Sequence, residues 1–167
     1  AGLYPVAGGA ILYQDESASL KENIVGKSPK EIIDRGITMA FVPEDRLGMG
    51  LVAGMDMVEN MMLKSYGEGK GPFVDRKPPR AMAERLIKEL EIVTPGISTP
   101  IRKLSGGNVQ KVLLGREIAC NPSVLIVAYP VRGLDINSSY RIYDFLNEQK
   151  KKGVAVIFIG EDLDVLM

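Results

Sequence analysis

Two uninterrupted apolar runs in the last third of the chain constrain its fold more than any other feature. They cover residues 124–128 and 154–159, and neither alternates polar with apolar residues. Strands of this kind are covered by helices on both faces, as in a parallel sheet. The stretch 137–152 between them carries its apolar residues on one helical face, and Gly153 follows as a helix stop. This order is that of a right-handed strand–helix–strand crossover and predicts an α/β fold.

The first part of the chain adds shorter elements. Residues 10–13 and 37–42 are predicted to be strands. Between them, Ser28, Pro29 and Glu31 predict the start of a short helix. Serine at the N-cap, proline in the first turn and glutamate three residues after the serine together form a capping box.

The middle of the chain is predicted to be helical. Helices are predicted at 56–64 and at about 79–91, and the first is rich in methionine. We interpret the eight methionines of the chain mainly as core filler. The expected organisation is an α/β core formed by 1–45 and 120–167, with a helical subdomain at 46–119.

Composition excludes several classes of function. The chain has no histidine, so a histidine base or a histidine-ligated metal is impossible within it. Lys plus Arg and Asp plus Glu both number 21, and this neutral balance disfavours a nucleic-acid partner. The single cysteine, Cys120, is expected to be buried and reduced. With no signal peptide and no apolar stretch near the roughly 20 residues that span a bilayer, the expected location is cytoplasmic.

Two glycine-containing segments resemble nucleotide loops only superficially. Gly26, Lys27 and Ser28 match the end of a phosphate-binding loop, but Lys21 stands where that pattern needs glycine. The segment 48–53 lacks the direct strand-to-helix transition of a dinucleotide fingerprint. We interpret the first as part of a helix cap and the second as a flexible turn.

The strongest motif is the octet 104–111, Leu-Ser-Gly-Gly-Asn-Val-Gln-Lys. Ser105, Gly106 and Gly107 place a hydroxyl and bare backbone N–H groups at the start of a predicted helix that runs to about Ala119. Such a helix start carries partial positive charge and unpaired donors, which suit an anion such as phosphate. Taken alone, Ser-Gly-Gly is more often explained by simple helix capping.

The surroundings of the octet favour the first interpretation. The octet resembles the signature motif of ABC-type ATPases, in the form found in importers of simple sugars and nucleosides. Segment 41–46 is similar to that family's Q-loop region, with Glu44 in place of glutamine, and 133–135 is similar to its D-loop. The resemblance covers nearly the whole chain and implies a partial RecA-like parallel-sheet core with an inserted helical subdomain.

The resemblance also implies a set of nucleotide contacts. In this family two ATPase halves pack head to tail, so each signature contacts the nucleotide held by the other half. The candidate cofactor-binding residues are Ser105, Gly106, Gly107, Asn108, Gln110, Glu44 and Asp135. The implied cofactors are ATP and Mg²⁺ in the full assembly. The implied partners are an N-terminal ATPase half, a second ATPase subunit and transmembrane permease subunits at the inner face of the cell membrane.

The chain departs from the family at its own ATP site. Ala128 and Tyr129 stand where the family has Asp-Glu, and Glu161 stands at the position of the switch histidine. Alanine offers no oxygen to a metal, and tyrosine, with an ordinary pKa of about 10, is a poor base. The family's phosphate loop has no counterpart in the sequence. We therefore expect the chain to be a fragment of the second, C-terminal ATPase half, which is degenerate, has no catalytic residue and no metal site, and binds ATP weakly or not at all by itself.

Three functions follow from these observations. The first is an ATPase half of a sugar or nucleoside importer whose signature acts on a partner's nucleotide. The second is a noncatalytic regulatory domain that only docks on membrane subunits. The third, an ABC protein of translation or DNA repair, is disfavoured by the neutral charge and the importer-like motifs. Candidate contacts to the membrane subunits are Met49, Leu51, Met55 and Met57, for which a role in the core or in a loop is an equal alternative.

Overall fold

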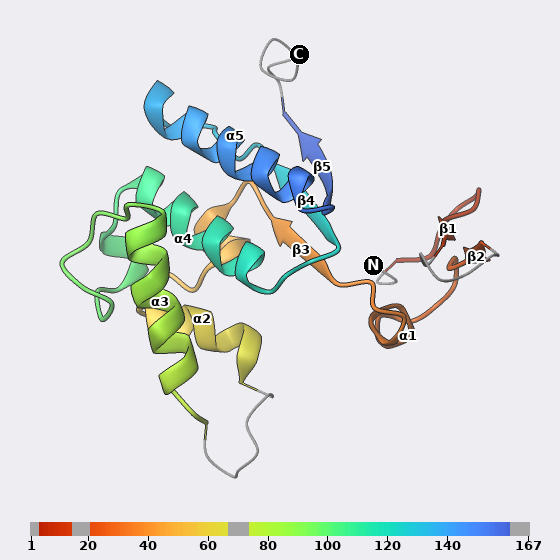
Figure 1. Ribbon diagram of the computed structural model, residues 1–167, viewed down its shortest axis with the longest axis horizontal. Helices are drawn as coiled ribbons and strands as arrows, with labels where there is room; N and C mark the ends of the chain where they lie inside the picture. The colour runs from red at the N-terminus through yellow and green to blue at the C-terminus, as the bar shows by residue number, and fades with distance from the viewer. Residues whose placement is uncertain (1–3, 15–20, 67–73, 161–167) are drawn as a thin grey trace. The chain divides into compact units, whose positions relative to one another are not determined.

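The computed structural model describes residues 4–14, 21–66 and 74–160. The chain divides into two compact units, Ala1–Met39 and Ala40–Met167, and Figure 1 labels the helices and strands of both. Within the described ranges, no helix has the length and apolar character needed to cross a membrane.

The N-terminal unit contains a two-residue antiparallel ladder and one short helix. Strand β1 (Leu12–Tyr13) pairs with β2 (Glu22–Asn23), so the strand predicted at 10–13 is present but shorter. The Glu22 carboxylate accepts hydrogen bonds from Arg35 at 2.8 and 2.9 Å and forms an ion pair with Lys27 at 3.2 Å. The Arg35 guanidinium, followed by the Lys27 ammonium, lowers the pKa of Glu22 from 4.5 to about 2. Surface charge therefore ties β2 to the residues that flank the helix.

Helix α1 (Pro29–Asp34) begins with the predicted capping box. The Ser28 hydroxyl accepts from the Glu31 backbone N–H at 3.3 Å, and the Glu31 carboxylate accepts from the Ser28 N–H at 2.8 Å. Ser28 is thereby committed to the helix start. The interpretation of Gly26, Lys27 and Ser28 as part of a cap is confirmed.

The second unit contains a three-stranded sheet in the order β3-β4-β5. Its strands are β3 (Met39–Val42), β4 (Val124–Ala128) and β5 (Ala155–Ile159). Strands β4 and β5 run parallel, with Val124 opposite Ala155. Helix α5 (Ile136–Lys151) connects them, and Gly153 follows it at φ +88°. The predicted crossover and its glycine stop are confirmed (Figure 1).

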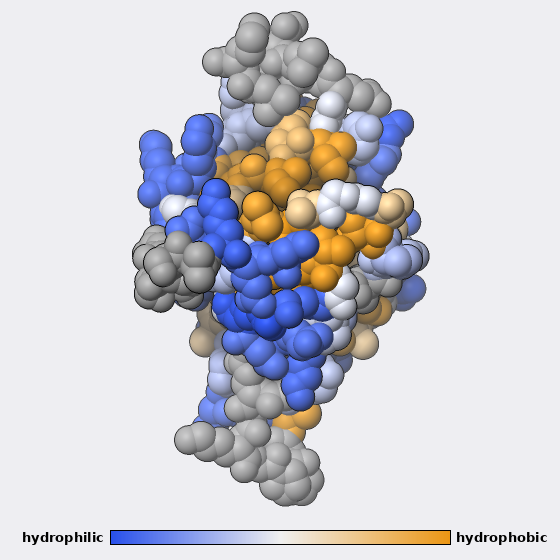
Figure 2. Space-filling model, turned by 90° about the vertical axis from the view of Figure 1, so that its right-hand side faces the viewer, coloured by the Kyte–Doolittle hydropathy of each residue, from blue (hydrophilic) through white to orange (hydrophobic). Residues whose placement is uncertain are grey.

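Within the described part of the second unit, helices cover only one face of this sheet. Val42, Leu125 and Val127 are 0% exposed and belong to the core cluster that also includes residues of α4 and α5. On the opposite face, Ile157 of β5 is 50% exposed, and Figure 2 shows apolar side chains gathered at the surface. The prediction that both faces are covered is wrong for the described residues, because the helices that pack on the sheet lie on the same side of it.

The remaining elements of the second unit are helical. They are the π-helix η1 (Arg46–Gly50), α2 (Met57–Ser65), α3 (Lys77–Glu89), the 3₁₀ helix η2 (Ile101–Lys103) and α4 (Gly106–Ala119). Met57 and Met61 of α2 are buried, so the interpretation of methionine as core filler is confirmed for them. Helices α2 and α3 pack together, as Figure 1 shows.

Three local expectations are wrong. The segment at 48–53, interpreted as a flexible turn, begins inside η1, whose first turn is capped by the Asp45 carboxylate accepting from the Gly48 N–H at 2.8 Å. Cys120 is exposed, because it lies at the C-cap of α4. Leu51 and Met57 are buried in the core, so they offer no docking surface.

Candidate functional site

The start of α4 is the centre of the candidate site. Ser105 is the N-cap, and its hydroxyl accepts from the Asn108 side-chain amide at 2.9 Å and from the Asn108 backbone N–H at 3.5 Å. The Asn108 side-chain oxygen in turn accepts from the Val93 N–H at 2.9 Å. Ser105 and Gly106 are exposed. The capping interpretation is thus confirmed, while the helix start itself stays open to a ligand.

Two other segments reach this helix start. A Cβ atom placed on Gly106 would lie 3.5 Å from Nη1 of Arg46, and one placed on Gly107 would lie 3.4 Å from Oγ of Ser138. The glycines therefore allow η1 and the first turn of α5 to approach the signature closely. A guanidinium beside a helix N-terminus adds positive charge where the backbone N–H groups already favour anions.

The Glu44 segment is joined to the loop after β4. The Glu44 carboxylate forms an ion pair with Arg132, and the Arg46 guanidinium donates to the Arg132 backbone oxygen. Burial lowers the pKa of Arg46. The sequence reasoning missed both arginines as members of this site, although Arg46 directly follows the Glu-Asp pair of the Q-loop-like segment.

Asp135 lies at the N-cap of α5. Its carboxylate accepts from the Ser138 backbone N–H at 2.9 Å and from the Ser138 hydroxyl at 2.6 Å. These bonds, the hydroxyl's first, lower the pKa of Asp135. Because Ser138 also approaches Gly107, the structure brings Asp135 into the same neighbourhood as the signature.

Gln110 differs from the other candidates. It is 0% exposed, and its amide nitrogen and oxygen have no hydrogen-bond partner among the described residues. In this conformation a ligand at the surface cannot reach the side chain. Binding of nucleotide by Gln110 stays a prediction, and it requires a rearrangement of α4 or its neighbours.

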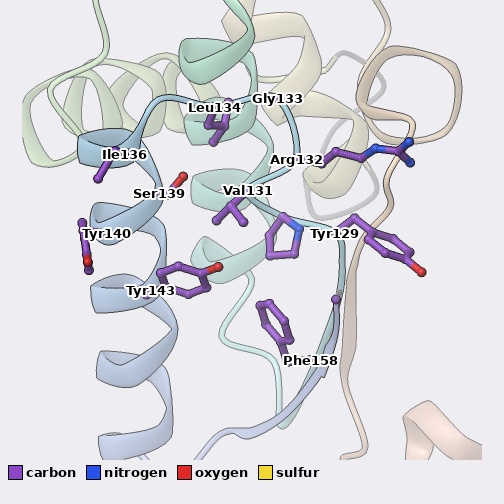
Figure 3. A pocket seen from close by; sticks show the side chains of 12 residues that line it. Tyr129, Val131, Arg132, Gly133, Leu134, Ile136, Ser139, Tyr140, Tyr143 and Phe158 are labelled. Carbon is purple, nitrogen blue, oxygen red and sulfur yellow. The ribbon is translucent and has the colours of Figure 1, made fainter. Parts of the chain in front are cut away.

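The positions that the resemblance matches to the family's Asp-Glu pair form a different surface. Ala128 ends β4, and Tyr129 follows with φ +48° while its N–H donates to the Ile159 oxygen at 2.7 Å. Beside this loop lies a cavity of about 470 Å³, into which Tyr143 and Phe158 project (Figure 3). It lies at the carboxyl ends of two parallel strands, the edge where α/β sheets bind ligands. Glu161 lies outside the described residues.

The cavity beside the end of β4 and the start of α4 differ in the ligands that their residues can bind. Among the residues that the structure describes, those lining the cavity are mainly apolar and aromatic and include no Asp or Glu. Since Mg²⁺ prefers carboxylate and other oxygen ligands, the residues at the end of β4 do not fit a magnesium site. The start of α4 does fit a phosphate group, because it offers the Ser105 hydroxyl, backbone N–H groups and the Arg46 guanidinium.

Sequence comparison identifies relatives along nearly the whole chain. The ribose import ATP-binding protein RbsA of Rhodopirellula baltica is 37% identical over 169 residues, which cover 99% of this chain and 31% of that protein. The xylose import ATP-binding protein XylG of Moorella thermoacetica is 35% identical over 141 residues, covering 84% of this chain and 28% of that protein. The chain thus spans about a third of the length of these relatives. No protein-family model matches the sequence.

Solved structures agree on the fold. A nucleotide-free ATP-binding cassette from an ABC transporter superposes with a TM-score of 0.70 at 21% identity, covering 99% of this chain and 64% of that one. A dimeric ATP-binding cassette in a post-hydrolysis state with ADP and Pi gives a TM-score of 0.67 at 22% identity, covering 87% of this chain and 61% of that one. At this level of identity the likeness establishes the fold alone.

The fold is that of part of an ABC ATPase cassette, with a RecA-like core and inserted helices. Within that class, the chain is homologous to a segment of the ATP-binding proteins of ABC sugar importers, represented by the ribose and xylose import proteins. That segment makes up about a third of the length of each of those proteins. The resemblance stated from the octet 104–111 and its neighbouring motifs is confirmed.

Proposed function

We propose that the chain is part of the ATP-binding subunit of an ABC importer for simple sugars or nucleosides. In this proposal residues 105–108 complete a nucleotide site held by a partner ATPase half, and ATP hydrolysis there is coupled to transport. The observation that carries the proposal is the exposed start of α4, where the Ser105 hydroxyl and the Arg46 guanidinium flank two glycines. The names of the relatives support sugar import.

The asymmetry of the proposed assembly rests on the end of β4. Ala128 and Tyr129 supply neither a metal ligand nor a base at neutral pH, and no acidic side chain of the described ranges lines the adjacent cavity. The half formed by this chain is therefore proposed to be degenerate. Turnover would take place at the site that this chain completes rather than at the one it would hold.

The proposed partners follow from the same scheme. They are an N-terminal ATPase half, a second ATPase subunit and permease subunits in the cell membrane, with this chain peripheral on the cytoplasmic side. The helical segment 46–119 is the proposed docking region, as the resemblance implies. Of the four suggested contact residues, Met49 has a strongly exposed side chain, at 73%. Replacing Met49 with Asp would then weaken assembly with the permease subunits.

The signature role is tested in the assembled transporter with two substitutions at one position. Ser105→Arg places a bulky cation at the helix start and is expected to abolish the ATP turnover that depends on this signature. Ser105→Ala removes the cap, at about 1 kcal/mol, and the hydroxyl assigned to the phosphate, but leaves the backbone N–H groups accessible, so a partial loss of turnover is expected. Ser98→Arg, at an exposed serine of the same unit, controls for the added charge.

The outcome separates the two leading functions. Normal turnover in the Ser105→Arg assembly, with all subunits present, would exclude the signature role and leave the noncatalytic docking domain. A calorimetric titration of this chain with Mg·ATP tests the degenerate half. Binding weaker than about millimolar, or absent, is expected, whereas micromolar binding would contradict the proposal.

A further inference from the structure

The segment that carries Glu44 is anchored at both of its ends by two adjacent residues of α4. At its start, the Phe41 N–H of β3 donates to the Glu117 carboxylate at 3.3 Å. At its end, the Gly50 oxygen of η1 accepts from the Arg116 guanidinium at 2.7 Å. The anchoring residues are neighbours in sequence and lie on the helix whose first turn is the signature motif.

Arg116 and Glu117 are themselves bound to each other and buried. One Glu117 oxygen accepts from Arg116 Nε at 3.0 Å and Nη2 at 2.8 Å, while the other accepts from Lys64 of α2 at 3.0 Å. The Glu117 and Arg116 side chains are 1% and 7% exposed, whereas that of Lys64 is 40% exposed. The cluster therefore joins β3, η1, α2 and α4 through a single carboxylate.

The packing of η1 on α4 leaves little freedom at the second anchor. A Cβ atom on Gly50 would lie 2.8 Å from a methyl carbon of Leu113, so η1 lies directly against α4. Buried charges with several hydrogen bonds tolerate few alternative arrangements, because moving any one partner leaves another unpaired. A displacement of α4 must therefore carry Phe41 and Gly50 with it or break the cluster.

We infer that Arg116 and Glu117 are positioning residues that hold the Glu44 segment in a fixed relation to the signature helix. A nucleotide contact at the first turn of α4 is then transmitted to Glu44 and, through Lys64, to α2. The transmission rests on the proposed function, because it needs nucleotide at the signature. The anchoring does not, and it can be measured on the chain alone.

Amide hydrogen exchange measures the anchoring directly. Glu117→Gln leaves one acceptor oxygen where the carboxylate has two, so either Arg116 or the Phe41 and Lys64 donors lose their partner. The exchange rate is expected to rise at least about tenfold at Phe41 or at Leu51, whose N–H donates to the Arg46 oxygen and closes η1. A rise of this size is expected because a hydrogen bond to a charged group contributes more free energy than a tenfold change in rate represents. Glu84→Gln, at a 52% exposed glutamate of α3, is the matched control.

A second variant separates the two ends. Arg116→Lys keeps a cation beside Glu117 but lacks the fork that also reaches Gly50. It should raise exchange at Leu51 while leaving Phe41 protected. Equal acceleration throughout the sheet, including β4, would mean that the cluster only stabilises the fold and would overturn the inference. Unchanged exchange at both Phe41 and Leu51 in both variants would overturn it as well.

The functional consequence is read in the assembled transporter. Arg116→Lys is expected to lower kcat severalfold with little change in KM for ATP, since Glu44 is displaced while the partner half still holds the nucleotide. A change in KM alone would contradict this expectation. The two proposals fail independently: normal turnover in Ser105→Arg removes the signature role, yet the exchange results would still decide whether the segment is anchored.

Discussion

The two units of the chain are stabilised by different means. In the N-terminal unit, Ile32 is the buried apolar residue among those described. Its parts are joined by contacts that include the ion pairs of Glu22 and the hydrogen bond from the Tyr13 hydroxyl to the Arg35 oxygen, and α1 is stabilised by its capping box. The second unit has a contiguous apolar core to which β3, β4 and helices α2 to α5 all contribute. Every described residue of the candidate site lies in this second unit.

This difference determines how firmly each unit can hold a segment in a fixed position. An exposed ion pair contributes about 0–1 kcal/mol and is weakened by salt, so it holds a segment only loosely. Packed side chains resist small displacements. A helix start that is proposed to meet a partner's nucleotide needs the second kind of support, and α4 has it along most of its length.

The largest effect is expected from removing the buried carboxylate. Glu117→Leu leaves Arg116 buried without its partner, and breaking a buried pair in this way costs about 3–5 kcal/mol. Chemical denaturation followed by circular dichroism measures the loss. Glu84→Leu, at an exposed position, should change stability by less than about 0.5 kcal/mol. Equal stability of the two variants would mean that the cluster contributes no more than a surface pair.

A smaller effect is expected where α4 packs on α3. A Cβ atom on Gly115 would lie 2.7 Å from a Leu90 methyl and 3.0 Å from a Leu86 methyl. Overpacking costs about 1–3 kcal/mol, from which the roughly 1 kcal/mol advantage of alanine over glycine in a helix is subtracted. Gly115→Ala should therefore lower the denaturation midpoint. Gly54→Ala, at a glycine with no atom within 4 Å of the added carbon, should not.

These same regions show which parts of the fold and of the candidate site could be predicted from the sequence. The strand–helix–strand crossover, the capping box at Ser28 and the helix start at Ser105 were predictable because each depends on local residue types. The uncovered sheet face was not, since an apolar strand looks the same whether one or both of its faces are packed. Arg46 and Arg132 were missed as site residues because their contacts join segments 86 residues apart. Gln110 was predicted to contact nucleotide, and its side chain is buried.

The N-terminal unit should respond to loss of a cap. Ser28→Ala removes the hydroxyl that accepts from Glu31, at a cost of about 1 kcal/mol. Because α1 has only six residues, the whole helix should exchange faster, with the Ile32 amide as the reporter. In Ser105→Ala, α4 should lose protection only in its first turn. Fraying of α4 along its length would contradict the contrast between the units.

The smallest effect is a pH dependence confined to the N-terminal unit. The folded pKa of Glu22, about 2, is depressed below its ordinary 4.5, mainly by hydrogen bonds from Arg35. A group with a depressed pKa stabilises the fold above its unfolded pKa, and this contribution is lost as the pH falls from about 4.5 through 2. Titration of the Glu22 carboxyl by NMR should show the low value, and Arg35→Met should raise it. An ordinary pKa for Glu22 would mean that its ion pairs do not stabilise the unit.

Cys120 gives the protein a ready attachment point for a spectroscopic probe. It is the only cysteine in 167 residues and it is exposed, so a maleimide dye would label one position without prior mutagenesis. That position caps the end of α4 opposite the signature, and a 14-residue helix separates the two by about 21 Å. Energy transfer from a fluorescent nucleotide on the proposed partner half to this dye would fall within a measurable range, and the approach of the two proposed halves could be timed during turnover.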